Sequence, residues 1–79
     1  MDPSTTEHEL KNMSHNILWI RQQYRLSQKQ LAQCLGISVG SLRTLEKGIL
    51  PPRLSVAFIF QIQKLYHIPP GKLFSSRYG

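Results

Sequence analysis

Apolar residues recur three or four positions apart along much of the chain, the spacing that places them on one face of a helix. The first clear series is Ile17, Ile20 and Tyr24. Because serine is a preferred residue at helix N-termini, Ser14 is predicted to cap a helix that contains this series. Residues 1–13 lack the pattern, and we expect them to form a flexible tail.

The next two apolar series are shorter and lie close together in the sequence. Ser27 can cap a helix that begins at Gln28, and Gly36 can end it because glycine readily takes the left-handed conformation found after helices. Ser38 can cap a further helix over residues 39 to about 47. The inward-facing residues are predicted to be Leu31, Ala32, Leu35, Leu42 and Leu45. Two short helices joined by a glycine-containing turn are typical of a helix-turn-helix.

The rest of the chain predicts a loop, a helix and a final turn. Pro51-Pro52 cannot continue a helix, so residues 49–53 are expected to form a loop. Ser55 is predicted to cap a fourth helix that runs to about Tyr66. The apolar bulk of this helix is expected from Ala57, Phe58, Phe60, Ile62 and Leu65. Residues 71–74 can add one short turn.

These elements predict a single domain of the all-α class. No alternating apolar pattern and no hairpin turn signal is present in the sequence. We therefore expect a compact four- to five-helix domain with a central helix-turn-helix over residues 14–75, followed by a C-terminal tail over residues 76–79. The length of 79 residues suits one small domain with a thin core.

Composition excludes several classes of protein. Cys34 is the one cysteine, so an internal disulfide is impossible and a cytoplasmic setting is expected. The longest apolar run, residues 56–60, is far shorter than the roughly 20 residues that span a membrane, so no membrane partner is predicted. The short chain also leaves no room for a separate domain that binds a small-molecule ligand.

Charge is distributed unevenly along the chain. Asp2, Glu7 and Glu9 lie in the first nine residues, which contain no Lys or Arg. The remaining residues hold ten basic side chains and one acid, Glu46, so their net charge is +9, above the +6 of the whole chain. Such an excess favours a nucleic acid as partner, because Lys and Arg release counterions from phosphates. Solubility and attraction to anionic lipid are the alternatives.

Candidate catalytic and metal-binding residues are few. His8, His15, His67 and Cys34 lack the spacing of metal ligands, so no metal is predicted. Glu46 is the only carboxylate after residue 9, which leaves no pair for acid–base chemistry. We therefore expect a protein that is not an enzyme and needs no cofactor.

One series of residues carries a resemblance to a known family. The series is Arg21, Leu26-Ser27-Gln28, Leu31-Ala32, Leu35-Gly36-Ile37-Ser38 and Leu45-Glu46-Lys47-Gly48. It resembles, in both identity and spacing, the helix-turn-helix domain of Cro/C1-type repressors, also called the XRE family. The resemblance covers residues 17 to 74. It implies a five-helix DNA-binding domain of bacterial or phage regulators that usually acts as a dimer on a two-fold operator.

The resemblance also implies roles for individual residues. Gln28 would grip a phosphate at the start of the second helix, and Lys47 and the loop through Arg53 would meet the DNA backbone. Arg21 and Glu46 would form a structural ion pair. The full set of residues expected to contact DNA is Gln28, Lys29, Ser38, Val39, Gly40, Arg43, Thr44, Lys47 and Arg53.

The third helix leaves the mode of DNA recognition open. Arg43 can grip guanine through two hydrogen bonds, or it can clamp a phosphate or remain in solvent. Val39 and Gly40 stand where many family members carry hydrogen-bonding side chains. The start of this helix can therefore touch a thymine methyl or the sugar-phosphate wall, or leave specificity to DNA shape. A motif that has drifted from DNA binding is the remaining alternative.

Several large apolar residues exceed what a small core readily hides. They are Trp19, Phe60, Tyr66, Ile68 and Phe74. These residues are expected either to line a homodimer interface or to pack in the core. The sequence thus predicts a transcriptional repressor that binds double-stranded DNA as a homodimer at the nucleoid. The alternative is a protein-interaction module that binds a partner regulator or toxin through Trp19, Val39 and Ile49-Leu50.

Overall fold

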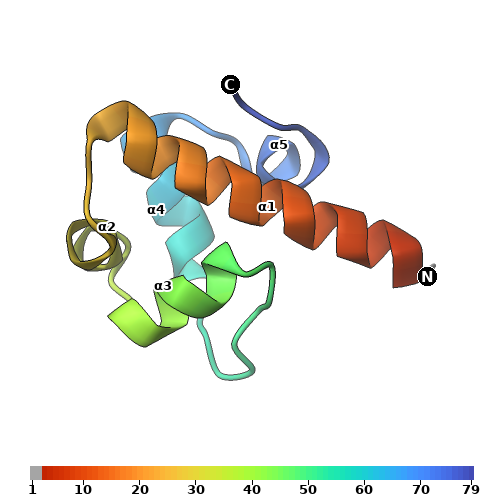
Figure 1. Ribbon diagram of the computed structural model, residues 1–79, viewed down its shortest axis with the longest axis horizontal. Helices are drawn as coiled ribbons and strands as arrows, with labels where there is room; N and C mark the ends of the chain where they lie inside the picture. The colour runs from red at the N-terminus through yellow and green to blue at the C-terminus, as the bar shows by residue number, and fades with distance from the viewer. Residues whose placement is uncertain (1–2) are drawn as a thin grey trace.

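The computed structural model describes residues 3–79, with side chains from Glu7 onward. Its helices are α1 (Pro3–Tyr24), α2 (Gln28–Leu35), α3 (Val39–Glu46), α4 (Ala57–Tyr66) and α5 (Pro70–Ser75). Figure 1 shows α1 running the length of the molecule, with α3 below it and α5 above it. No strand occurs within residues 3–79, and the prediction of an all-α fold is confirmed. None of the described helices is long and apolar enough to cross a membrane.

Helix α1 begins at Pro3, so the predicted start at Ser14 is wrong. Leu10 and Met13 extend the three- and four-residue spacing of the later apolar residues, and Met13 is fully buried. Ser14 lies inside the helix, where its hydroxyl donates a hydrogen bond to the Lys11 carbonyl at 3.0 Å. Residues 3–13 are therefore helical, and Leu10 and Met13 contribute to the core. Residues 1–2, including Asp2, lie outside the described part.

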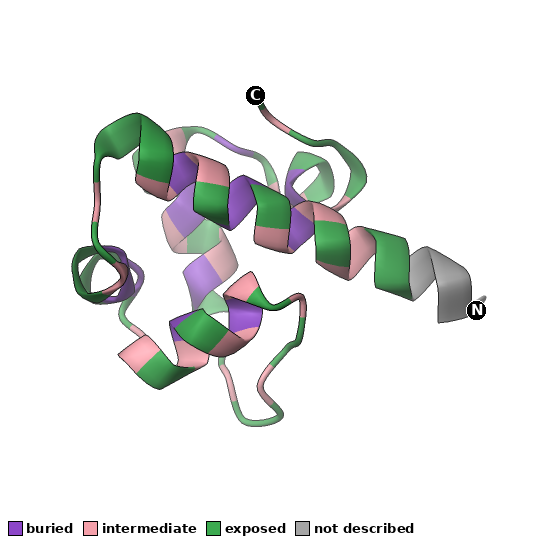
Figure 2. Ribbon diagram, in the orientation of Figure 1, coloured by how far each residue is buried: buried purple, intermediate pink, exposed green. Residues whose placement is uncertain are grey.

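The core joins all five helices. Its buried apolar side chains include Met13, Ile17, Ile20, Leu31, Ala32, Leu35, Leu42, Leu45, Phe58, Ile62, Ile68 and Leu73. Figure 2 shows these buried stretches on the sides of the helices that face one another. Each fully buried Leu or Ile contributes about 1.5–3 kcal/mol of transfer free energy, so this shared core holds the helices together.

Helix α4 buries less of its apolar surface than the sequence predicts. Its N-cap residue is Val56, which makes no side-chain cap, although the Ser55 hydroxyl accepts a hydrogen bond from the Ala57 N–H at 3.2 Å. Phe58 and Ile62 face the core. Phe60 is 61% exposed, because it lies on the opposite side of the helix.

The C-terminal residues pack along α1. The Asn16 side chain is fully buried and donates from Nδ2 to the carbonyls of Leu73 and Ser76, both at 2.7 Å. Its Oδ1 accepts the Tyr78 N–H at 2.8 Å, and the Tyr78 ring lies 5.3 Å from the Trp19 ring. Asn12 Nδ2 donates to the Phe74 carbonyl at 2.9 Å, and His15 Nε2 lies 2.7 Å from the Tyr78 carbonyl. We call these contacts the C-terminal clasp (Asn12, His15, Asn16 and Trp19 with residues 73–79). Residues 76–79, predicted as a tail, are therefore attached to the domain.

Candidate nucleic-acid interface

Helix α2 begins with a capping box, as the serine before it predicts. The Ser27 hydroxyl accepts the Gln30 N–H at 3.1 Å, and the Gln30 side-chain oxygen accepts the Ser27 N–H at 2.8 Å. The first intrahelical donor is Leu31, whose N–H bonds to the Ser27 carbonyl. The N–H groups of Gln28 and Lys29 therefore stand at the positive end of the helix, where an anion is favoured.

The turn between α2 and α3 is sharp and capped on both sides. Gly36 adopts a φ of 70° in the left-handed region, which residues with a side chain rarely adopt. Ser38 then caps α3, because its hydroxyl oxygen accepts the Ser41 N–H at 3.0 Å. The predicted caps at Ser27 and Ser38 and the predicted turn at Gly36 are confirmed, and together they join α2 to α3.

A chain of polar side chains joins α1, α2 and α3. Arg21 Nε donates to Glu46 Oε2 at 2.7 Å, which gives the expected ion pair. Gln28 Nε2 donates to the other oxygen, Glu46 Oε1, at 2.6 Å. Arg43 Nε then donates to Gln28 Oε1 at 3.3 Å. We call these residues the Glu46 cluster (Arg21, Gln28, Arg43 and Glu46).

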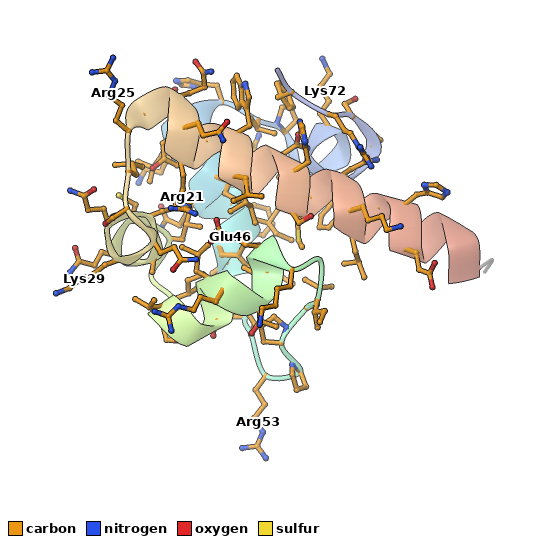
Figure 3. All side chains as sticks on the ribbon, in the orientation of Figure 1. Arg21, Arg25, Lys29, Glu46, Arg53 and Lys72 are labelled. Atoms are coloured by element: carbon orange, nitrogen blue, oxygen red, sulfur yellow. The ribbon has the colours of Figure 1, made fainter. Side chains whose placement is uncertain are left out.

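The Glu46 cluster hides the one acid that follows residue 9. The Glu46 side chain is only 6% exposed and the Arg21 side chain 24%, and Figure 3 shows the two facing each other between α1 and α3. Burial of an ion pair costs about as much as the pair returns, so its main effect is to fix positions and charge. Lys29 and Arg53 point away from the body of the molecule in Figure 3.

The structure places most of the residues expected to contact DNA at the surface. The exposed ones are Lys29, Ser38, Gly40, Arg43, Lys47 and Arg53, and the half-buried ones are Gln28, Val39 and Thr44. Val39 packs against the core. The Thr44 hydroxyl donates to the Gly40 carbonyl at 3.0 Å, which leaves its lone pairs and its methyl group for a ligand. All of these residues lie on α2, in the turn before α3, on α3 or in the loop after it.

Sequence reasoning missed two bonds of the Glu46 cluster. The bonds of Gln28 to Glu46 and of Arg43 to Gln28 join residues 18 and 15 positions apart, on different helices. A chemical signal for the first of these bonds was available. Glu46 has two carboxylate oxygens and Arg21 binds one of them, so a second donor is expected at the other. No group of three potential metal ligands occurs among the described residues.

The residues predicted for a dimer interface have different environments. Ile68 is 2% exposed in the single chain, so of the two alternatives it takes core packing. Trp19, Tyr66 and Phe74 pack partly against the core, and Phe60 is the most exposed of the set. Tyr66 lies 4.8 Å from the Tyr24 ring. Burial, followed by a hydrogen bond with the exposed Cys34, raises the pKa of Tyr66 to about 12.

Comparison with known proteins gives one match. A protein-family model described as helix-turn-helix matches residues 17–73, from the middle of α1 into α5. Searches of curated proteins and of solved structures return no match. The matched segment contains all of the Glu46 cluster and all of the residues expected to contact DNA.

Proposed function

The chain belongs to the helix-turn-helix family of Cro/C1-type DNA-binding regulators, and we propose that it is a repressor that binds a specific double-stranded sequence. Two copies bind the two halves of a two-fold operator and block a promoter, in the cytoplasm and at the nucleoid. The observation that carries the proposal is the Glu46 cluster. It sets the exposed Arg43 of α3 beside the start of α2.

The surface offers separate groups for phosphates and for bases. The free N–H groups of Gln28 and Lys29 suit a phosphate, and Lys47 adds a positive charge at the end of α3. Arg43 presents a guanidinium group, which matches the O6 and N7 acceptors of guanine in the major groove. Helix α3 is accordingly the element that enters the major groove.

The shape of the molecule suits a dimer on adjacent half-sites. Its extents are 34 × 27 × 18 Å. Half-sites on one face of DNA are about 34–36 Å apart, so two copies side by side match that spacing. Phe60 on α4 and Val56 just before this helix supply exposed apolar surface for contact between the copies.

Selection from random duplexes tests this function directly. We expect enrichment of a two-fold repeat whose half-sites are centred about 10 base pairs apart. The logarithm of the affinity is expected to fall linearly with the logarithm of the salt concentration. The slope of this line should be about −0.9 for each phosphate that the protein neutralises. Failure to retain any duplex at low salt contradicts the proposal.

Exposed apolar residues beside α3 favour one other function. Ile49 and Leu50 are 54% and 46% exposed in the loop that follows the helix. A partner regulator or toxin that covers them would use the helix-turn-helix as a protein-binding scaffold. Retention of a partner protein at high salt, with no duplex bound at low salt, would support this function over repression.

A further inference from the structure

We propose that Gln28 and Glu46 are positioning residues for Arg43, and that they set the base preference of Arg43 without touching that base. The inference rests on the proposed function. It gives Gln28 a role in specificity, whereas the family resemblance implies only a phosphate contact. It also makes Glu46, which is nearly buried, a determinant of sequence preference.

The chemistry of its neighbours allows the Gln28 amide only one orientation. The ionised Glu46 carboxylate accepts hydrogen bonds only, and the Arg43 guanidinium donates only. Gln28 Nε2 therefore faces Glu46, at 2.6 Å, and Gln28 Oε1 faces Arg43, at 3.3 Å. The reversed amide would set oxygen against oxygen and N–H against N–H. The negative charge of Glu46 thus dictates that an acceptor points at Arg43.

The hydrogen bond that Arg43 donates to Gln28 also determines which edge of the guanidinium is free. It uses Arg43 Nε, so both terminal Nη atoms remain available at the far end of the guanidinium. This end-on pair can donate two parallel hydrogen bonds to the O6 and N7 atoms of guanine. An exposed arginine otherwise samples many rotamers, and holding it before DNA arrives lowers the cost of ordering it on binding.

The start of α3 explains why this support comes from α2. Val39 has no hydrogen-bonding side chain and packs against the core. The Thr44 hydroxyl donates to the Gly40 carbonyl. Neither Val39 nor Thr44 therefore supports the Arg43 side chain from within α3. Gln28 reaches it from the adjacent helix.

The test measures discrimination at a single base pair. Binding is measured to the selected operator and to variants with one base pair changed at a time. The base pair read by Arg43 is identified as the one at which Arg43→Ala loses discrimination. In the wild type, we expect a change of this base pair to lower the affinity on the order of ten- to a hundredfold. Gln28→Met keeps the length of the side chain but removes both donor and acceptor. We expect it to reduce discrimination about fivefold at this pair and nowhere else.

Glu46→Gln tests the orientation argument. The new amide would turn its oxygen toward Arg21 and its NH₂ toward Gln28, because Arg21 only donates. Gln28 would then reverse and present its own NH₂ to Arg43. We expect a loss of discrimination at the Arg43 pair at least as large as that of Gln28→Met.

Gln33→Met is the matched control, because Gln33 lies exposed on the same helix. We expect it to change neither affinity nor discrimination. Discrimination is a ratio of two affinities of one protein sample, so a partly unfolded variant does not imitate the effect. Gln28→Met overturns the inference if it weakens all duplexes equally. An Arg43→Ala variant that keeps all discrimination also overturns it, with the proposed function intact. If the wild type binds no duplex, the proposed function fails as well.

Discussion

Helix α1 is held by two polar contacts of different kinds, the Glu46 cluster at Arg21 and the C-terminal clasp at Asn16. In the clasp, a fully buried amide bonds to backbone groups through both of its N–H donors and its oxygen. In the cluster, side chains bond to side chains and the series ends at an exposed guanidinium. The clasp therefore contributes stability, while the cluster keeps groups that can bind a ligand.

Bond lengths and burial support this division. The bonds of Asn16 measure 2.7 to 2.8 Å, whereas the bond from Arg43 to Gln28 is 3.3 Å and exposed. Among the described residues, no buried side-chain nitrogen or oxygen lacks a hydrogen-bond partner. Loss of the Asn16 bonds would leave buried polar groups unpaired, but loss of the Arg43 bond would leave a solvated group. Substitutions in the two regions should therefore affect different measurements.

The largest effect is expected from Asn16→Ala. It removes three hydrogen bonds and leaves two carbonyls and one N–H without their partner, so the free energy of unfolding should fall by about 2–4 kcal/mol. Denaturant unfolding measures the change. Base discrimination by the fraction that remains folded should match the wild type.

Asn12→Ala is the control for Asn16→Ala, because Asn12 also bonds to the C-terminal segment but is only partly buried. We expect Asn12→Ala to lower the free energy of unfolding by about 1 kcal/mol, since water can take the place of the Asn12 side chain at its partners. Loss of base discrimination in a folded Asn16→Ala protein would contradict the separation of the two regions.

Arg43→Ala is expected to give the opposite result. Discrimination at one base pair should fall by about 1–3 kcal/mol, because the guanidinium is the group that reads it. The free energy of unfolding should change by less than about 0.5 kcal/mol, since Arg43 is exposed. Equal losses of affinity on specific and random DNA for Arg43→Ala would contradict base reading.

Lys47→Ala should instead lower the affinity for all duplexes alike. The slope of log affinity against log salt should fall by about one unit, because one phosphate contact is lost.

The sequence predicts the α2–α3 region well because its signals are local. Ser27 and Ser38 act on N–H groups three residues ahead, and Gly36 acts through its own backbone. Such effects depend on neighbours in the chain, so the positions of the caps and the turn could be predicted without a structure. The ion pair of Arg21 with Glu46 required the family resemblance, because these residues are 25 positions apart.

The clasp could not be predicted, for the same physical reason. Asn16 and Leu73 are 57 positions apart, and an isolated asparagine has no pattern that identifies a distant partner. The start of α1 was missed because residues 3–9 are polar, and Leu10 and Met13 are too few to show a period alone. The sequence also left open whether Phe60 packs in the core or lines an interface, because its apolar character does not say which side of α4 it occupies, and in the structure it is exposed.

Gly40→Ala is expected to have the smallest effect and separates stability from binding at one residue. A Cβ at this position would meet only the Ser38 hydroxyl oxygen, at 3.9 Å, so the fold accommodates it. Because alanine favours a helix over glycine, the free energy of unfolding should rise by up to about 1 kcal/mol. Affinity for DNA should nevertheless fall, since the methyl group would stand between α3 and the sugar-phosphate wall.

Gly71→Ala provides the matched comparison for Gly40→Ala. Gly71 is likewise the second residue of its helix, α5, and a Cβ there would meet nothing within 4 Å. Unfolding and duplex binding measured on both variants should show a similar gain in stability, with a loss of affinity for Gly40→Ala alone. If both variants bind DNA as the wild type does, Gly40 is not kept for close approach, and Arg43 carries the base recognition of α3 without it. Gly40 and Arg43 share the exposed face of one short helix. At such a position alanine gives the more stable fold, so stability alone does not explain a glycine there.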